Sequence, residues 1–259
     1  MIRLHGKPPY KTILIHGGPG AIGSLEICAD RLSRLSGEGV VEALQSKYSV
    51  AELTEELYGQ IRENCAGKVT LIGHSWGAWL AAFFAAAYPL LCENVVLVGC
   101  PPLQDQYVKA INSRRMQNLS QAEREIFRRL SENRASDEDM GKIPQILEKS
   151  DNYCLEYSEI PENLMADGRM HNCIWSEAAA LRTNGDLLAA FQKIQSRLYL
   201  IQGAFDPHPA EGVIRPLKEN EISCETYILE KCGHSPFQEK YAKEVFYRVL
   251  IGICESHLR

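Results

Sequence analysis

Residues 68–88 read KVTLIGHSWGAWLAAFFAAAY and follow the order of a strand, a tight turn and a helix. An apolar run ends at Gly73, a G-x-S-x-G pentapeptide is centred on Ser75, and an alanine-rich stretch comes next. Glycines on both sides of the serine permit a turn in which larger side chains would collide with the adjoining strand and helix. Such a turn exposes the Ser75 hydroxyl at the carboxyl end of a strand, where it can act as a nucleophile.

A serine hydroxyl is a weak nucleophile that needs a base, and the base needs an acid to orient it. The segment RLYLIQGAFD places Asp206 just after a predicted strand, and CETYILEKCGHSPF places His234 after the last one. The order Ser, Asp, His is the one used when these groups follow strands of one parallel sheet. We therefore predict a catalytic triad of Ser75, His234 and Asp206, with Asp105 as the fallback acid and His208 as a competing histidine.

The motifs HGGPG at 16–20, GHSWG at 73–77, LIQGAFD ending at Asp206 and CGHSPF around His234 resemble the α/β-hydrolase superfamily. The pairing of HGGPG with HSWG is most similar to the proline iminopeptidase group of serine aminopeptidases. In that group two backbone amides form the oxyanion hole, and the resemblance implies Gly18 and Trp76 for these roles. Gly17 is a further substrate-binding candidate, because it lets the loop approach the developing oxyanion. His16 and His74, which flank the motifs, are expected to pack or to support the site.

Short apolar runs alternate with helical patterns, as is typical of a parallel α/β sheet. Predicted strands are 12–16, 40–44, 69–73, 95–99, 198–202 and 224–229, and predicted helices are 49–64 and 75–88. Compared with iminopeptidases, the segment GVVEALQSKYSV at 39–50 is short and only residues 1–11 precede the first predicted strand. We expect an α/β-hydrolase fold with a trimmed, mostly parallel sheet of about six strands flanked by helices.

The region between about 103 and 186 has a helical, amphipathic pattern without a convincing strand. Ser120 and Glu123 form a capping box for a helix that carries Ile126, Phe127 and Leu130 on one side. We expect an α/β-hydrolase core of residues 1–102 and 187–259, with residues 103–186 as a helical cap over one end of the sheet.

The predicted cap contains five acids and no lysine or arginine between Asp151 and Asp167. Because an aminopeptidase holds the substrate ammonium with carboxylates, Glu156 and Glu159 are candidates for substrate binding, and a solvated acidic face is the alternative. Trp175 either lines the pocket or anchors the cap. The leading hypothesis is a serine hydrolase that cleaves an ester or amide through an acyl-enzyme, in an aminopeptidase-like manner. A carboxylic-ester or thioester hydrolase without aminopeptidase activity is the alternative.

The stretch ILIHGGPGAIG at 13–23 also contains G-x-G-x-x-G, followed after roughly twenty residues by Glu42, as in a dinucleotide-binding fingerprint. Pro19 removes an amide from the loop that would bind pyrophosphate. An NAD-dependent oxidoreductase is therefore a remote alternative, as is a non-catalytic binding protein on the hydrolase fold. In the hydrolase interpretation Glu42 is an ordinary strand-end residue.

The 259 residues carry a net charge of −5, which argues against nucleic acid or an anionic membrane as a partner. No apolar run has the length of a membrane span. Nine scattered cysteines without a C-x-x-C pair are typical of a reduced cytosolic protein rather than of a zinc site. We expect a cytoplasmic enzyme without metal or cofactor that acts on a small molecule or short peptide, and composition leaves its oligomeric state open.

Overall fold

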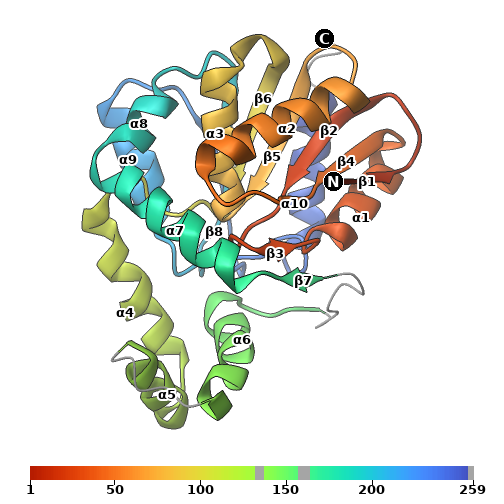
Figure 1. Cartoon of the computed structure of the whole chain (residues 1–259). Helices are drawn as coiled ribbons and strands as arrows, with labels where there is room; N and C mark the ends of the chain where they lie inside the picture. Colours follow the sequence, from red (N-terminus) through yellow and green to blue (C-terminus); the bar gives the residue numbers. More distant parts are fainter. Residues whose placement is uncertain (132–136, 157–163, 256–259) are drawn as a thin grey trace.

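The computed structural model describes residues 1–131, 137–156 and 164–255. In this part of the chain, a seven-stranded sheet in the order β1-β4-β2-β5-β6-β8-β9 lies between two layers of helices (Figure 1). The strands are β1 (Ile2–His5), β4 (Gly39–Ala43), β2 (Tyr10–Ile15), β5 (Val69–His74), β6 (Cys92–Val98), β8 (Arg197–Gly203) and β9 (Glu225–Leu229). All six predicted strands are present and pair in parallel, while β1 runs antiparallel to β4 at the edge.

Alternate residues of the central strands face opposite helix layers, because side chains alternate along a strand. Ile13 and Ile15 lie in the core cluster with helices α2, α3, α8 and α9, whereas Leu14 lies in the cluster with α1 and α10. The helices are α1 (Glu26–Ser36), α2 (Val50–Asn64), α3 (Trp76–Ala87), α8 (Asp186–Phe191), α9 (Glu211–Glu219) and α10 (Lys243–Glu255). No helix within the described ranges is long and apolar enough to cross a membrane.

Glu42 is not the ordinary strand-end residue that the sequence indicated. It lies inside β4, is fully buried, and accepts a hydrogen bond from the Leu25 amide at 3.2 Å. Its Oε2 is 3.3 Å from Nη1 of Arg3 on β1. Glu42 therefore holds the edge strand and the start of α1 against the sheet, which is a structural task.

Between β6 and β8 the chain is largely helical, as expected. Helices α4 (Val108–Asn118), α5 (Gln121–Ser131) and α6 (Asp137–Asp151) form an arm that projects from the carboxyl edge of the sheet (Figure 1). Leu119, Ile126 and Ile146 make a small core of their own there. The capping box is confirmed, since the Ser120 hydroxyl accepts the Glu123 amide at 3.4 Å. The Leu130 side chain lies outside the described residues.

Helix α7 (Gly168–Thr183) packs differently from the arm. Its side chains Met170, Ile174 and Ala178 belong to the same core cluster as those of α3 and α8. The two-residue strand β7 (Met165–Ala166), which the sequence did not indicate, pairs antiparallel with β3 (Ala21–Ile22). The division into a core and a cap at 103–186 stays a prediction, and α7 shares its packing with the core.

Candidate active site

Ser75 lies in the turn between β5 and α3 with φ 55° and ψ −124°. A positive φ is unfavourable for a residue with a Cβ, and such strain is often found at functional sites. A Cβ at Gly73 would lie 2.2 Å from the Gly77 carbonyl oxygen, and one at Gly77 would lie 2.2 Å from that of Ile15. The two glycines of the motif are therefore required sterically, for the reason that the sequence suggested.

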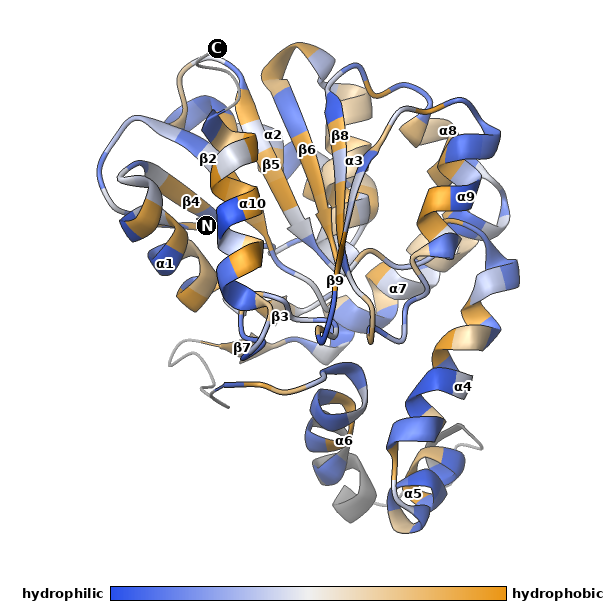
Figure 2. Cartoon of the chain, turned by 180° about the vertical axis from the view of Figure 1, so that it is seen from behind, coloured by the Kyte–Doolittle hydropathy of each residue, from blue (hydrophilic) through white to orange (hydrophobic). Residues whose placement is uncertain are grey.

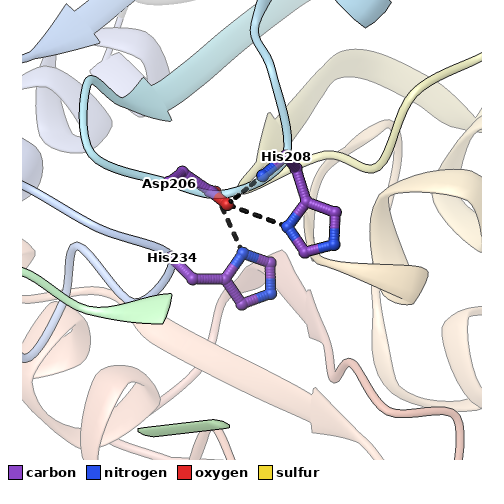
Figure 3. A group of neighbouring side chains, drawn as sticks. All are labelled: Asp206, His208 and His234. Atoms are coloured by element: carbon purple, nitrogen blue, oxygen red, sulfur yellow. Dashed lines mark hydrogen bonds and ion pairs between the residues drawn. The ribbon is translucent and has the colours of Figure 1, made fainter. Parts of the chain in front are cut away.

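Asp206 follows β8 and His234 follows β9, and their side chains meet. Nδ1 of His234 donates to Oδ2 of Asp206 at 2.9 Å (Figure 3). Strand β6 ends between this pair and Ser75: the Ser75 amide donates to the Val98 carbonyl at 2.8 Å, and a Cβ at Gly99 would lie 3.0 Å from His234 Nδ1. The structure thus pairs Asp206 with His234 directly and places the Ser75 turn at the neighbouring strand end. Within the described residues no hydrogen bond joins the Ser75 hydroxyl to His234, so the triad stays a prediction.

The carboxylate of Asp206 is fully buried and accepts several hydrogen bonds. Its donors are His234 Nδ1, Gln202 Nε2 at 2.9 Å, the His208 amide at 2.9 Å and His208 Nδ1 at 2.8 Å. Burial raises the pKa of Asp206, but the two imidazoles outweigh it and hold that pKa well below its usual range. Burial lowers the pKa of His234, and the charge of Asp206 more than offsets this, so that the pKa is raised.

Two other histidines, His208 and His74, lie directly beside His234. The ring centroid of His208 is 4.6 Å from that of His234, and His208 shares Asp206 with it (Figure 3). Nε2 of His74 donates to the His234 carbonyl oxygen at 2.9 Å, and burial lowers the pKa of His74 to about 3. The fallback acid Asp105 instead binds Arg182 on α7, with Nε–Oδ1 2.6 Å.

The loop at residues 16–20 lies directly against the turn at Ser75. A Cβ at Gly17 would lie 2.9 Å from Cβ of Ser75. Trp76 is the first residue of α3, where backbone amides have no partner within the helix. Gln45 joins loop and helix, because its Nε2 donates to the His16 carbonyl oxygen at 2.9 Å and its Oε1 accepts from Trp76 Nε1 at 3.0 Å. The loop that carries Gly18 is thereby fixed relative to the amide of Trp76.

Trp175 of α7 stacks on Trp79 of α3, with ring centroids 5.9 Å apart and planes inclined by 8°. Trp79 lies in the first turn of α3, four residues after Ser75. The half-buried Trp175 thus fits the interpretation of an anchor, and its contact with substrate stays a prediction. Nδ1 of His171, one turn earlier on α7, donates to the Pro19 carbonyl oxygen at 3.2 Å.

Two of the five acids between Asp151 and Asp167 have basic partners. The Glu156 carboxylate pairs with Lys243 of α10. Asp151 accepts two hydrogen bonds from the Arg115 guanidinium, at 2.8 Å from Nε and 2.6 Å from Nη2. Glu159 lies outside the described residues. Among the described acids, Asp151 and Glu156 therefore have their charge balanced within the protein.

Sequence reasoning missed Glu239, a fully buried carboxylate beneath the His234 loop. Its Oε1 accepts the amides of Gly233 at 2.7 Å and Tyr153 at 2.6 Å, and its Oε2 accepts that of Cys154 at 2.7 Å. These bonds tie the end of α6 to the turn before His234. The only signal in the sequence is that Glu239 follows the histidine closely.

The atoms of Asp206, His208 and His234 that could bind a metal ion lie within 4.8 Å of one another. Such a spacing occurs both in metal sites and in hydrogen-bonded networks. The contacts between each Nδ1 and the carboxylate have ordinary hydrogen-bond lengths, which accounts for the convergence. We assign no metal to this group, and independence of metals and cofactors stays a prediction.

Comparison with known proteins gives the family. Residues 13–247 match the alpha/beta hydrolase family. The chain belongs to the alpha/beta hydrolase family. The match includes the glycine-rich stretch, so residues 13–23 belong to the segment that shows the family, and the dinucleotide-binding interpretation loses its basis.

Solved alpha/beta hydrolases cover almost the whole chain. VinJ superposes with a TM-score of 0.74 at 18% identity, over 98% of this chain and 94% of VinJ. Proline iminopeptidase from Mycobacterium smegmatis gives 0.70 at 14% identity, over 99% and 94%. Monoacylglycerol lipase from Paleococcus ferrophilus gives 0.62 at 16% identity, over 99% and 98%. Identities this low show a shared fold alone.

One curated relative matches over a short segment. Protein PHYLLO, chloroplastic, from Arabidopsis thaliana is 31% identical over 91 residues, which are 35% of this chain and 5% of that protein. The chain thus matches only a small fraction of the length of this relative.

Proposed function

We propose that this protein is a serine hydrolase that cleaves an ester or amide bond of a small molecule or short peptide through an acyl-enzyme. The observation that carries the proposal is the convergence of the strained Ser75 turn with the His234–Asp206 pair at the carboxyl edge of the sheet. Strain at Ser75 and a buried, ionised acid behind His234 serve no purpose in packing, whereas both serve nucleophilic catalysis. Composition alone supports the proposed cytoplasmic location.

In the proposed mechanism the Ser75 oxygen attacks the carbonyl carbon while Nε2 of His234 takes the hydroxyl proton. Collapse of the tetrahedral intermediate breaks the bond to the leaving group, which receives that proton from His234. Water then attacks the acyl-enzyme, gives one proton to His234, and releases the acid as the proton returns to Ser75. Asp206 stays ionised throughout and holds Nδ1–H of His234, which fixes the tautomer that presents a basic Nε2.

Negative charge on the substrate oxygen is stabilised by the amides of Gly18 and Trp76 in this proposal. Support comes from the contact of Gly17 with Ser75 and from the place of Trp76 at the start of α3. The positive end of the helix dipole adds to this stabilisation. Fixed amide donors of this kind contribute on the order of 3 kcal/mol each to the transition state.

Hydrolysis of a carboxylic ester or thioester, without aminopeptidase activity, is the second candidate. It is favoured by the pairing of Asp151 with Arg115 and of Glu156 with Lys243, because a carboxylate that is already paired with a cation binds a substrate ammonium weakly. The aminopeptidase-like candidate then depends on the remaining acids of this stretch, among them Glu159, which lies outside the described residues.

The test combines a covalent probe with three substrates. A fluorophosphonate should label the wild type and the control Ser113→Ala, an exposed serine on α4, but not Ser75→Ala. Turnover of a proline arylamide, its N-acetyl form and a short nitrophenyl ester should fall at least about 10³-fold in Ser75→Ala. Loss of arylamide cleavage on N-acetylation supports the aminopeptidase candidate, and cleavage of the ester alone supports the esterase. Unchanged cleavage by Ser75→Ala would refute the proposal.

A further inference from the structure

His208 makes a contact that the Ser75–His234–Asp206 triad does not require. Oδ2 of Asp206 accepts from His234, while Oδ1 accepts twice from His208, at 2.9 Å from its amide and 2.8 Å from Nδ1 (Figure 3). Oδ2 also accepts from Gln202 Nε2. The His208 side chain is only 9% exposed. Gln202 also holds the backbone of His208, because its Nε2 donates to the His208 carbonyl oxygen at 3.0 Å. The carboxylate is thus held between two imidazoles.

We propose that His208 is a positioning residue that sets the basicity of His234 through Asp206, an inference that rests on the proposed serine hydrolase function. A hydrogen bond donated to one carboxylate oxygen stabilises the anion and weakens its attraction for a cation at the other oxygen. The Nδ1–H of His208 therefore limits how strongly Asp206 stabilises the imidazolium form of His234. A general base must be unprotonated before it can accept the serine proton, so this restraint keeps more of the enzyme competent near neutral pH.

The protonation state of His208 fits this role. Burial lowers the pKa of His208, and this outweighs the opposing influence of Asp206. A neutral ring that donates through Nδ1 bears no charge that would repel the imidazolium of His234. His208 thus acts through its hydrogen bond to Oδ1.

Other charged and titratable groups face His234 from separate elements. Asp151 at the end of α6 raises the pKa of His234, and Arg115 on α4 lowers it. The ring of His74, at the end of β5, lies 4.8 Å from that of His234, and Arg114 on α4 donates to the Asp206 carbonyl oxygen at 3.1 Å. None of these groups is hydrogen-bonded to the His208 side chain. Replacing that side chain therefore acts on His234 through Asp206 and through the contact between the two rings, whose centroids are 4.6 Å apart.

The test compares His208→Leu, which removes the donor, with His208→Asn, whose Nδ2 keeps a donor close to the position of Nδ1. The readout is kcat/KM between about pH 5 and pH 9, where an unprotonated His234 is needed and activity falls towards acid. We expect the acidic limb of this pH profile, where kcat/KM falls as His234 becomes protonated, to move to higher pH in His208→Leu by about half a unit to one unit. The loss should appear in kcat, with KM close to that of the wild type. His208→Asn should keep the wild-type limb.

His5→Leu is the matched control, because His5 lies 3.7 Å from Glu42 at the far edge of the sheet and its side chain is 11% exposed. It should leave the limb in place. If His208→Leu proves too unstable in thermal unfolding, His208→Ala replaces it. A wild-type limb in the Leu or Ala variant, or a shift of equal size in His208→Asn, overturns the inference. If Ser75→Ala is inactive while His208→Leu leaves the limb unmoved, only the inference fails; an active Ser75→Ala defeats the proposed function itself.

Discussion

The arm α4–α6 and helix α7 both lie between β6 and β8, yet they support different halves of the active site. The arm contacts the acid–base half. Arg114 donates to the Asp206 carbonyl oxygen at 3.1 Å, and the His234 amide donates to the Asp151 carbonyl oxygen at 2.8 Å. Asp151 is in turn held by the guanidinium of Arg115. Helices α4 and α6 of the arm therefore contact the two loops that carry the proposed catalytic acid and base.

Helix α7 and the residues before it contact the nucleophile half instead. Strand β7 pairs with β3, the Asp167 amide donates to the Gly20 carbonyl oxygen at 2.9 Å, and His171 donates to that of Pro19. A Cβ at Gly20 would lie 2.3 Å from the Asp167 carbonyl oxygen, so the two segments touch at the backbone. Helix α7 and the residues before it therefore fix the loop that carries the proposed oxyanion donor Gly18.

Packing separates the two regions as clearly as their contacts do. The arm is largely hydrophilic and has a small core of its own, whereas α7 shares the main core with α3 (Figure 2). A substitution far out in the arm should leave the sheet intact, because few core side chains depend on the arm. A substitution on the buried face of α7 affects the fold and the oxyanion loop together.

The largest expected effect tests this difference in packing. Ile174→Ala on α7 removes a fully buried side chain from the main core and should lower the free energy of unfolding by about 3 kcal/mol. Ile126→Ala in the arm, where the side chain is 8% exposed within a small cluster, should lower it by about 1 kcal/mol or less. Urea denaturation of both variants measures the difference. Equal losses would show that the arm unfolds with the main core, against this comparison.

The second prediction concerns the electrostatic influence of the arm on the base. The pKa of His234 is raised, and its unprotonated form is the active one, so activity is lost as the pH falls through that raised pKa. Arg115→Met removes a cation that lowers this pKa and should move the acidic limb of kcat/KM to higher pH. Asp151→Asn removes an anion that raises it and should move the limb to lower pH.

Breaking this ion pair should also destabilise the protein. The side chains of Arg115 and Asp151 are 19% and 9% exposed, so losing the cation leaves a nearly buried carboxylate without its partner. We expect Arg115→Met to lower the free energy of unfolding by about 2 kcal/mol, below the value for fully buried pairs because solvent screens part of the charge. Limbs that move in the same direction in both variants would contradict the assignment of the arm to the acid–base half.

The elements that the sequence predicted well are those with a local cause. The turn at Ser75 follows from two glycines beside a strand, and the capping box at Ser120 follows from residues three positions apart. Asp206 and His234 could be paired in advance because the carboxyl ends of parallel strands share one edge. The strand positions and the triad candidates thus need little information beyond the pattern of each segment.

The features that sequence reasoning missed depend on contacts between distant segments. Glu156 read as an unpaired acid because its partner, Lys243, lies on another helix far along the chain. The Glu239 carboxylate accepts hydrogen bonds from the Tyr153 amide, after α6, and from the Gly233 amide, before His234. No residue near Glu239 in the sequence indicates this role. His208 could be noticed beside Asp206, but whether its ring turned towards the carboxylate depended on how Gln202 held the loop. Partners of buried polar groups follow from tertiary approach, which periodicity does not encode.

The smallest expected effect concerns the nucleophile half, where α7 holds the oxyanion loop. His171→Leu removes the hydrogen bond to the Pro19 carbonyl and frees the loop to move away from the developing oxyanion. Because this donor acts only on the loop's position, kcat should fall about fivefold, equivalent to about 1 kcal/mol of transition-state stabilisation, with KM unchanged. The acidic limb should stay in place, since the base is untouched.

His171→Asn, whose Nδ2 can replace Nδ1 as the donor, should restore most of kcat, and Asn172→Ala at the exposed neighbouring position should behave like the wild type. Steady-state kinetics across the pH range separates this result from that of Arg115→Met, which moves the limb. A shifted limb in His171→Leu, or a higher KM with an unchanged kcat, would mean that α7 acts on the base or on substrate binding rather than on the oxyanion loop. The arm and α7 would then both act on the base or on substrate binding. The contacts of α7 with Pro19 and Gly20 would not be those that matter for the chemical step.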